Sequence, residues 1–255
     1  MKYLVCFPGG GLGNMLWAIN LSVNYALNYD RKLIIDSTQK GWFRKNIFDF
    51  INIHNSVIVD TAITNSTYDF VKLDKNYEFV KLDKNYEEDV IYTYSANHPQ
   101  NFHIFNYITI KKIILDEFYK RLSLLPKKFI SIHIRNTDKK SDYLNFLKDN
   151  KAKFVGKNIF LASDNFTVIE NIKNTYGSKV FCFSNIPENK DISGGIHYNH
   201  KGIDSQEFII DCFVDLLLLA HANEFYFSCP NSSYSKMAKH LFDNKAILKN
   251  ILGEK

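Results

Sequence analysis

Hydrophobic and polar positions follow two different periods along the chain, and together these periods predict a mixed α/β protein. A short apolar run at 3–7 leads into glycines. A segment at 14–28 follows, in which apolar side chains recur every three to four positions, and then a second apolar run at 32–36. Strand, glycine turn, helix and strand make one βαβ unit, which implies a parallel sheet.

The same alternation returns in the second half, after an amphipathic helix at 111–126 that ends in a proline. Strand-like runs lie at 128–134, 158–163, 179–183 and 224–229, and helical segments at 142–149, 165–177, 206–222 and 231–242. This order predicts a doubly wound α/β domain. We place the boundary near Pro126, which gives domains of residues 1–125 and 126–255 and a ligand-binding cleft between them.

The stretch from Gly41 to Ile110 follows neither period for long. Short strand-like runs occur at 56–60 and 89–94, and the nine residues FVKLDKNYE occur twice in tandem, at 70–78 and 79–87. A unit repeated only twice is too little for a solenoid. We interpret it as the enlargement of a surface loop or hairpin, without a catalytic role.

Composition narrows the class of protein. The 255 residues are 45% hydrophobic and 23% charged, as in ordinary globular proteins, and the longest apolar stretch is far too short to span a bilayer. A net charge of +5 suits an anionic ligand or membrane surface, but no concentrated basic stripe of a nucleic-acid binder occurs. Four scattered cysteines without a CxxC pair indicate reduced thiols, so we expect a cytoplasmic protein.

Candidate ligand-binding residues follow the strand at 128–134. Strand alternation puts His133 and Arg135 on one face at the carboxyl end, the edge at which open α/β sheets bind ligands. An arginine there suits a diphosphate, because its guanidinium can bond two oxygens at once. From these residues alone, an incidental salt bridge at a strand end is an equal alternative. Thr137, Asp138 and Lys139 add more polar groups than a simple turn requires.

Three acidic residues raise the same question of a functional or a structural role. Asp164 follows the next strand, where capping of the following helix is the simplest interpretation, although it shares the sheet edge of Arg135. Asp211 and Asp215 are the polar positions of an otherwise apolar run from Phe208 to Ala220. Such a stripe can be solvated, but we favour an Asp215 that points into the cleft and accepts hydrogen bonds from a ligand or neighbour.

Two turns before helices complete the candidate chemistry. Ser232 and Ser233 stand at a strand-to-helix junction, where free N–H groups and hydroxyls suit a phosphate, with simple helix capping as the alternative. The loop GGGLGN at 9–14 lacks the Gly-Lys ending of a P-loop and is one residue short of a dinucleotide fingerprint. No DxD, HExxH or GxSxG motif and no Cys/His cluster occurs, so we expect no metal site.

Taken in order, the stretches GGGLGNMLWAINLSVNYAL, SIHIRNTDK, FLASDN and VDLLLLAHANEFYFSCPNSSYSKMA resemble the fucosyltransferase superfamily of α-1,2-, α-1,6- and protein O-fucosyltransferases. The resemblance implies two Rossmann-like domains that face each other across a cleft, the GT-B arrangement. It also implies an inverting, metal-independent transfer of fucose from GDP-fucose to a glycan hydroxyl, in surface polysaccharide or lipopolysaccharide synthesis. No cofactor is implied beyond the GDP-sugar donor.

The resemblance also assigns roles to residues. Arg135 would hold the GDP phosphates with His133 alongside, and Asp215 would help to fix the guanosine. Arg135, Asp138 and Asp142 are the catalytic candidates, with one of the two aspartates taking the proton of the acceptor. The donor-binding candidates are Gly10, Gly11, Gly13, Asn14, His133, Arg135, Lys139, Asp164, Asp215, Ser232 and Ser233.

One departure from the family keeps alternatives open. Many relatives carry two adjacent arginines after the histidine, and here the second position is Asn136. A transferase for a different GDP-sugar therefore stays open, as does a non-catalytic nucleotide- or glycan-binding protein on the same fold. We expect a GDP-sugar and a glycan acceptor as partners, no nucleic acid, and peripheral contact with the inner face of the membrane.

Overall fold

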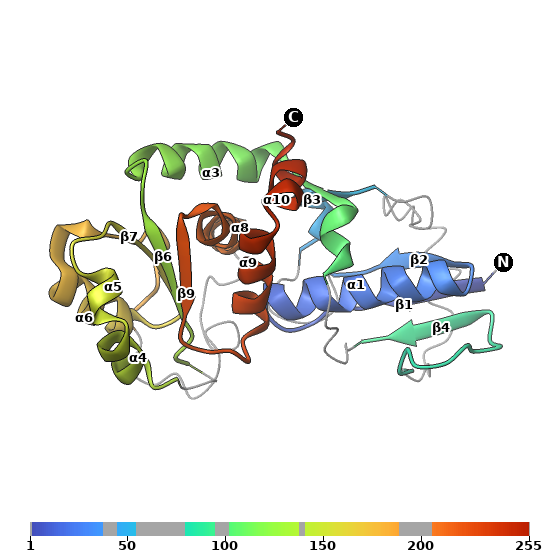
Figure 1. Ribbon diagram of the computed structural model, residues 1–255. Helices are drawn as coiled ribbons and strands as arrows, with labels where there is room; N and C mark the ends of the chain where they lie inside the picture. The colour runs from blue at the N-terminus through green and yellow to red at the C-terminus, as the bar shows by residue number, and fades with distance from the viewer. Residues whose placement is uncertain are drawn as a thin grey trace. The chain divides into compact units, whose positions relative to one another are not determined.

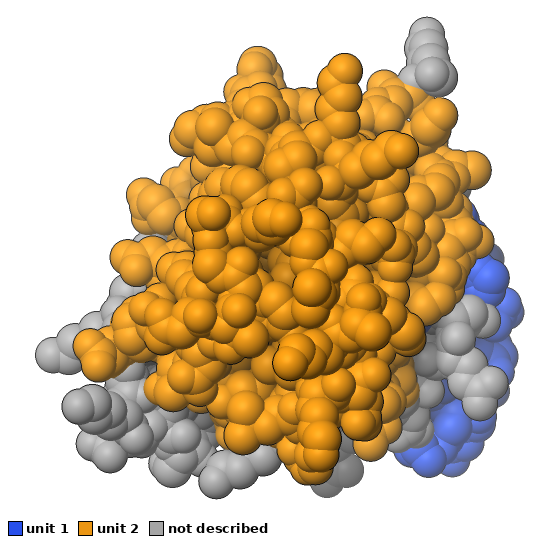
Figure 2. Space-filling view, turned by 60° about the vertical axis from the view of Figure 1, so that its left-hand side comes forward, with its two compact units in different colours: residues 1–111 blue, residues 112–255 orange. Residues whose placement is uncertain are grey.

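The computed structural model describes residues 2–37, 45–54, 80–94, 102–137, 141–188 and 206–254. The chain divides into two compact units, Met1–Lys111 and Lys112–Lys255 (Figures 1 and 2). Each unit contains a parallel sheet with helices, so the mixed α/β class predicted from the hydrophobic pattern is confirmed. The predicted strand at 56–60 and the first copy of the duplication lie outside the described residues.

Unit 1 begins with the predicted βαβ unit. It consists of β1 (Lys2–Cys6), α1 (Leu12–Asn28) and β2 (Arg31–Ile35), and β4 (Val90–Thr93) lies on the other side of β1. Both pairings of β1 are parallel, with Leu4 opposite Leu33 and Ile91. The other elements within the described residues of this unit are η1 (Ile47–Asp49), η2 (His103–Asn106) and the antiparallel pair β3 (Ile51–Ile53) and β5 (Ile108–Ile110).

Helix α1 forms where its sequence repeats apolar residues at helical spacing. Met15, Leu16, Ile19 and Val23 are almost fully buried. Asn20 is a buried polar side chain on the same helix, and its Oδ1 accepts a hydrogen bond from the N–H of Ile104 at 2.6 Å. This bond fastens η2 to α1 without leaving the amide unsatisfied.

Arg31 is a buried cation that holds the second copy of the duplication. Its side chain is 1% exposed, and its guanidinium donates to the carbonyl oxygens of Tyr3 at 3.2 Å, Glu88 at 2.9 Å and Tyr86. Tyr86 belongs to the copy at 79–87, and Glu88 comes directly after it. The described part of that copy is therefore a docked structural segment of unit 1.

Replacing Arg31 with methionine should lower the free energy of unfolding by about 2–4 kcal/mol, because three backbone carbonyls lose a charged donor. Chemical denaturation measures this change. The exposed Lys81→Met in the same segment is the matched control and should change stability by less than about 0.5 kcal/mol. Equal stabilities of the two variants would show that Arg31 does not hold the segment.

Unit 2 carries the larger sheet, with the strand order β8-β7-β6-β9 and every pair parallel. Its strands are β6 (Ile130–Ile134), β7 (Ile159–Ser163), β8 (Val180–Phe181) and β9 (Glu224–Phe227). Its helices are α3 (Lys112–Leu124), α4 (Tyr143–Asp149), α5 (Lys151–Phe154), α6 (Phe166–Tyr176), the short η3 (Gly177–Lys179), α8 (Gln206–His221), α9 (Ser233–Asp243) and α10 (Lys245–Leu252). The predicted alternation of strands and helices is confirmed, and α5 and α10 are additions to it.

The division between the units falls one helix before the predicted boundary at 125/126. Helix α3 belongs to unit 2 because it packs against α8, to which Arg121 is joined by an ion pair with Asp211. A proline marks the end of a helix, but the partner of that helix decides to which unit it belongs.

Strand β6 is the centre of the unit 2 core. All five of its residues are buried, and the hydroxyl of Ser131 donates to the carbonyl of Leu219 in α8 at 2.8 Å. No helix in the described ranges is long and apolar enough to cross a membrane. The four cysteines all lie in described ranges and are free thiols, with Cys6 and Cys229 buried and the other two half-buried.

Candidate functional site

The candidate site of unit 2 lies at the carboxyl edge of its sheet, beside β6. The chain passes from β6 to β7 and β8 on one side and places β9 on the other, so the strand order reverses at β6. Ligands of open α/β sheets bind in the crevice outside such a reversal. His133 lies near the end of β6 and Arg135 directly after it at this edge, and Ser232 caps α9 there after β9.

Asp164 gathers three donors at this edge. Its Oδ1 accepts the N–H of Asn136 at 2.8 Å, and its Oδ2 accepts the hydroxyl of Thr137 at 2.5 Å. Nη1 of Arg135 forms an ion pair with Oδ2 at 2.8 Å. The carboxylate therefore fixes both the guanidinium and the backbone that carries it.

The interpretation of Asp164 as a helix cap is wrong. The cap of α6 is the next residue, Asn165, whose Oδ1 accepts the N–H of Val168 at 3.1 Å. Sequence favours an aspartate at a cap, but a neighbouring asparagine caps equally well. The Asp164 carboxylate instead accepts hydrogen bonds from the loop that follows β6.

His133 is a neutral hydrogen-bonding group. Its Nδ1 lies 2.6 Å from the hydroxyl oxygen of Ser235, and its ring lies 5.1 Å from that of Tyr234. Burial, and to a lesser extent the charge of Arg135, lowers the pKa of His133 to about 3. Of the two groups predicted to emerge together from β6, only Arg135 carries charge near neutral pH.

The serines at the start of α9 have separate tasks. Ser232 is the N-cap, and its hydroxyl oxygen accepts the N–H of Ser235 at 3.3 Å, so the capping interpretation of Ser232 is confirmed. Ser235 uses its hydroxyl on His133, and Ser233 is the first helical residue. A phosphate role for Ser232 and Ser233 stays a prediction.

Two serines that we did not predict tie the loop after β6 to the end of β9. The hydroxyl of Ser141 donates to the carbonyl of Arg135 at 2.9 Å, and its oxygen lies 2.8 Å from that of Ser228. The N–H of Ser228 donates to the carbonyl of His133 at 3.1 Å. An isolated serine has no distinctive spacing, so only the folded chain reveals this pairing.

Asp142 has a structural task. It is the N-cap of α4, and its two carboxylate oxygens accept the backbone and side-chain N–H groups of Asn145 at 3.1 and 2.6 Å. Asp138 and Lys139 lie outside the described residues. The identity of the proton acceptor thus stays a prediction.

Asp215 belongs to a second charged group, between α3 and α8. Its Oδ2 accepts the hydroxyl of Ser184 at 2.6 Å, and its Oδ1 lies 4.0 Å from Nη1 of Arg121 without a hydrogen bond. Arg121 also pairs with Asp211, and with Glu117 at 2.7 Å. Asp215 therefore does accept a hydrogen bond from a neighbour, as one of our alternatives expects.

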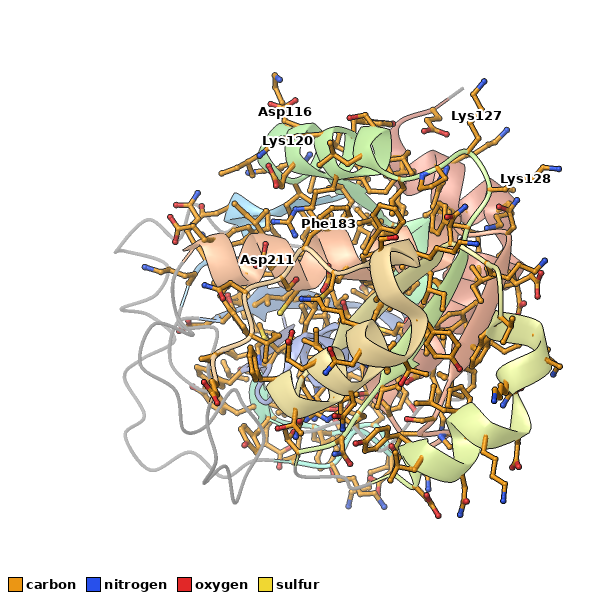
Figure 3. The ribbon with its side chains drawn as sticks, turned by 90° about the vertical axis from the view of Figure 1, so that its left-hand side faces the viewer. Asp116, Lys120, Lys127, Lys128, Phe183 and Asp211 are labelled. Carbon is orange, nitrogen blue, oxygen red and sulfur yellow. The ribbon has the colours of Figure 1, made fainter. Side chains whose placement is uncertain are left out.

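Figure 3 shows Asp211 on α8 with Phe183 beside it, below the α3 residues Asp116 and Lys120. The guanidinium carbon of Arg121 lies 5.9 Å from the centre of the Phe183 ring. We did not single out Arg121, Phe183 or Ser184 from the sequence. Their partners are distant along the chain, and no local pattern connects them.

Helix α9 connects the Arg135–Asp164 pair with the charged group around Arg121. The hydroxyl of Tyr234 donates to the carbonyl of Cys212 at 2.6 Å, which bonds the first turn of α9 to α8 beside Asp211. Burial raises the pKa of the Cys212 thiol well above its usual value. The charges of Asp215 and Asp211 add to this rise, and Arg135 opposes it. Arg135 and the two aspartates thus act on the same thiol.

The glycine loop of unit 1 occupies an equivalent place in its own sheet. Helix α1 starts after β1, which is central between β2 and β4. Gly10 has φ +77°, a left-handed conformation that favours glycine, and a Cβ on Gly9 would lie 2.9 Å from the ring of Tyr94. Gly11 caps α1 without a side-chain bond, which leaves a bare helix start.

The start of α1 differs slightly from the prediction. The helix begins at Leu12, two residues before the predicted Asn14, so Gly13 lies buried in its first turn. Asn14 is exposed. Glycine is a poor helix former in general, but it is tolerated at this end of the helix.

Comparison with known proteins identifies the fold. No protein-family model matches the chain, and no curated protein sequence does. The crystal structure of NodZ α-1,6-fucosyltransferase soaked with GDP-fucose superposes with a TM-score of 0.67 at 16% identity, over 94% of this chain and 93% of that one. POFUT1 in complex with GDP-fucose gives 0.56 at 14% identity over 95% and 94%.

A mutant of Arabidopsis thaliana FUT1 in complex with GDP gives a TM-score of 0.59 at 13% identity, over 94% of this chain and 68% of that one. At such identities these likenesses establish a fold. The chain has the fold of known fucosyltransferases, and the resemblance seen in the sequence is confirmed at that level.

Burial of Asp215 gives the protein a pH-dependent stability. The pKa of Asp215 is raised from 3.8 to about 7. Burial is the largest cause of the rise. The Ser184 hydrogen bond and the charge of Arg121 oppose it, and the charge of Asp211 adds to it. Between these values the folded protein keeps a proton that the unfolded chain has lost. The stabilisation is complete below the unfolded pKa and is lost as the pH rises through about 7.

Replacing Asp215 with asparagine should remove this dependence. Relative to the wild type, the free energy of unfolding of the variant should rise by about 2 kcal/mol from about pH 5 to about pH 8, because the wild type must ionise a buried carboxyl. Denaturation curves across this range measure the difference. Glu207→Gln, on the exposed start of the same helix, should show a constant difference; a constant difference for both variants would contradict the assignment.

Proposed function

We propose that this chain is an inverting, metal-independent glycosyltransferase that moves fucose from GDP-fucose to a hydroxyl of a glycan acceptor. One observation carries the proposal. Arg135 is held by Asp164 where the strand order reverses, in a chain whose fold matches NodZ soaked with GDP-fucose and POFUT1 in complex with it. We further propose surface polysaccharide or lipopolysaccharide synthesis on the cytoplasmic side as the setting.

Arg135 supplies the charge that the leaving group needs. As the bond between the sugar carbon and the β-phosphate oxygen breaks, negative charge develops on that oxygen. The guanidinium of Arg135 and the helix start at Ser232 stabilise it, while neutral His133 contributes hydrogen bonding. Because Asp164 already holds Arg135, little reorganisation is needed at the moment of reaction.

Inversion follows from the direction of attack. The acceptor hydroxyl approaches the sugar carbon from the face opposite GDP, so a new C–O bond forms as the old one breaks. The hydroxyl proton passes to a carboxylate, for which Asp138 and Asp142 are the candidates. The charge on GDP stays with Arg135 until the product leaves.

The guanine end of the nucleotide matches the chemistry of Asp215. Guanine presents an N–H and an amino group on one edge, and a carboxylate can accept from both. Among the described residues, Oδ1 of Asp215 has no hydrogen-bond partner, and Asp215 lies on the helix that Tyr234 joins to the Arg135 edge. We propose that Asp215 contacts guanosine, and that the glycine loop approaches the diphosphate across a cleft in a GT-B arrangement.

Asn136 supports the second candidate function, a non-catalytic nucleotide- or glycan-binding protein. Many members of the superfamily place a second arginine there, whereas this chain uses the Asn136 backbone, whose N–H donates to Asp164 and whose carbonyl accepts from Asn165 at 3.1 Å. A site with one cation binds a diphosphate less tightly than a site with two. A different GDP-sugar as donor is the third candidate.

A thermal-shift screen separates these candidates. GDP and GDP-fucose should raise the melting temperature, because a ligand at about 100 times its Kd adds about 2.7 kcal/mol of stability. ADP and UDP are the matched controls and should have little effect. GDP release on adding glycan acceptors then distinguishes enzyme from binder. A screen in which GDP, GDP-fucose and other GDP-sugars all leave the melting temperature unchanged would contradict every GDP-based candidate.

Arg135→Ala should lower kcat by about 100-fold to 1,000-fold, because one preorganised charge at the leaving group is lost. Arg135→Lys should retain part of the activity, since the charge stays but the two-pronged geometry is lost. Release of GDP from GDP-fucose measures both variants, and circular dichroism checks that they fold. The control is Lys173→Ala, an exposed cation on α6. Near-normal turnover in Arg135→Ala would overturn this site.

A further inference from the structure

The edge of the unit 2 sheet opposite the candidate site is lined by lysines. The strand starts lie side by side, with Ile130 of β6 paired to Ile159 and Glu224, and Ile159 paired to Val180. The segments that lead into these strands are therefore neighbours. We call these segments, residues 124–128, 150–158, 176–179 and 221–224, the basic edge.

Hydrogen bonds hold the basic edge in one arrangement. The N–H of Ile130 donates to the carbonyl of Asn158 at 2.9 Å, and the side chain of Asn158 donates to the carbonyl of Lys128 at 3.3 Å. Nζ of Lys179 donates to the carbonyl of Gly156 at 3.1 Å. The lysines thus project from a connected backbone.

The basic edge carries the whole positive excess of the chain. Its six lysines are exposed, and its one acid, Glu224, lies 3.8 Å from Lys157. Without these seven residues, the 32 cationic and 27 acidic residues of the chain become 26 of each. The adjoining Lys148 and Asp149 cancel each other. The six lysines are Lys127, Lys128, Lys151, Lys153, Lys157 and Lys179.

Two aliphatic side chains stand among these lysines. Leu124 is 60% exposed and Val155 is 59% exposed. In Figure 3, Lys127 and Lys128 extend away from the body of the unit after the end of α3. Exposed apolar side chains beside lysines suit a bilayer surface, where the ammonium groups meet lipid phosphates and the aliphatic groups enter the headgroup layer.

The chemistry of the edge favours lipid over nucleic acid. Single-stranded RNA is bound by aromatic rings on which bases stack. Phe154 is fully buried with its ring 5.1 Å from that of Tyr226, and the half-buried Tyr176 packs its ring edge-on against Phe154 at 6.3 Å. The cations are all lysines, which act as point charges, whereas arginine is preferred for phosphates at defined positions.

We propose that the basic edge docks this protein onto an anionic phospholipid surface. The candidate site lies at the other end of the same strands, so docking leaves the carboxyl edge directed away from the lipid. Lipid charge and the aliphatic side chains together provide the attraction. This surface is independent of the GDP-sugar site, and either can exist without the other.

Vesicle sedimentation of the full chain tests the proposal. Binding to phosphatidylcholine vesicles should appear only when phosphatidylglycerol is added, and should weaken as salt is raised. A variant with Lys127→Gln, Lys128→Gln and Lys151→Gln should bind about tenfold more weakly or worse. The control, Lys81→Gln with Lys84→Gln and Lys249→Gln, changes the net charge equally at other exposed positions and should bind within about twofold of the wild type.

A further variant, Leu124→Ser with Val155→Ser, should weaken vesicle binding and leave the melting temperature unchanged. Three results would overturn the proposal. The first is no binding to phosphatidylglycerol vesicles, and the second is an equal loss of vesicle affinity in the two lysine variants. The third is tight binding of single-stranded RNA together with unchanged vesicle binding by the serine variant. The last result would assign the edge to a nucleic acid. Melting temperatures equal to that of the wild type confirm that each variant is folded.

Discussion

The candidate site depends on the carboxylate of Asp164. Asp164 is 7% exposed, and an unpaired charge at that burial would be costly. Arg135, the N–H of Asn136 and the hydroxyl of Thr137 together satisfy it. The same bonds hold the end of β6 against the end of β7, so the position of the guanidinium and the shape of the sheet edge have one cause.

The charged group around Arg121 is built differently. One guanidinium faces Glu117, Asp211 and Asp215, so negative charge exceeds positive. In the part of the chain that the structure describes, neither Oδ1 of Asp215 nor Nη1 of Arg121 has a hydrogen-bond partner. A protein that minimised only its folding free energy would pair such atoms, and unpaired buried groups with shifted pKa values concentrate at functional sites. The imbalance is consistent with a ligand that supplies donors.

The parallel sheet separates the chemistry of unit 2 into two ends. At the carboxyl ends of the strands lie helix starts and a fixed arginine, a combination that favours small anions. At the amino ends lie exposed lysines, and within the described ranges Lys157 is the one of them with an acidic partner. Because all four strands point the same way, residues that follow strands never mix with residues that precede them. One sheet can thus bind a small ligand at the carboxyl ends of its strands and an extended surface at their amino ends.

Local sequence determined much of this protein. Apolar periodicity identified β1, α1, β2 and β4 of unit 1 and most elements of unit 2, but not β3, β5, α5 or α10. Alternation along 128–134 identified Arg135 as an edge residue. Such patterns depend on neighbours within a few positions. Tertiary structure decided the partners. In the structure α3 belongs to unit 2, and Asp164 pairs with Arg135 instead of capping α6. Arg121 lies beside Asp211 and Asp215. The ion pairs of Arg121 with these two aspartates join residues 90 and 94 positions apart, and they depend on packing that no local pattern encodes.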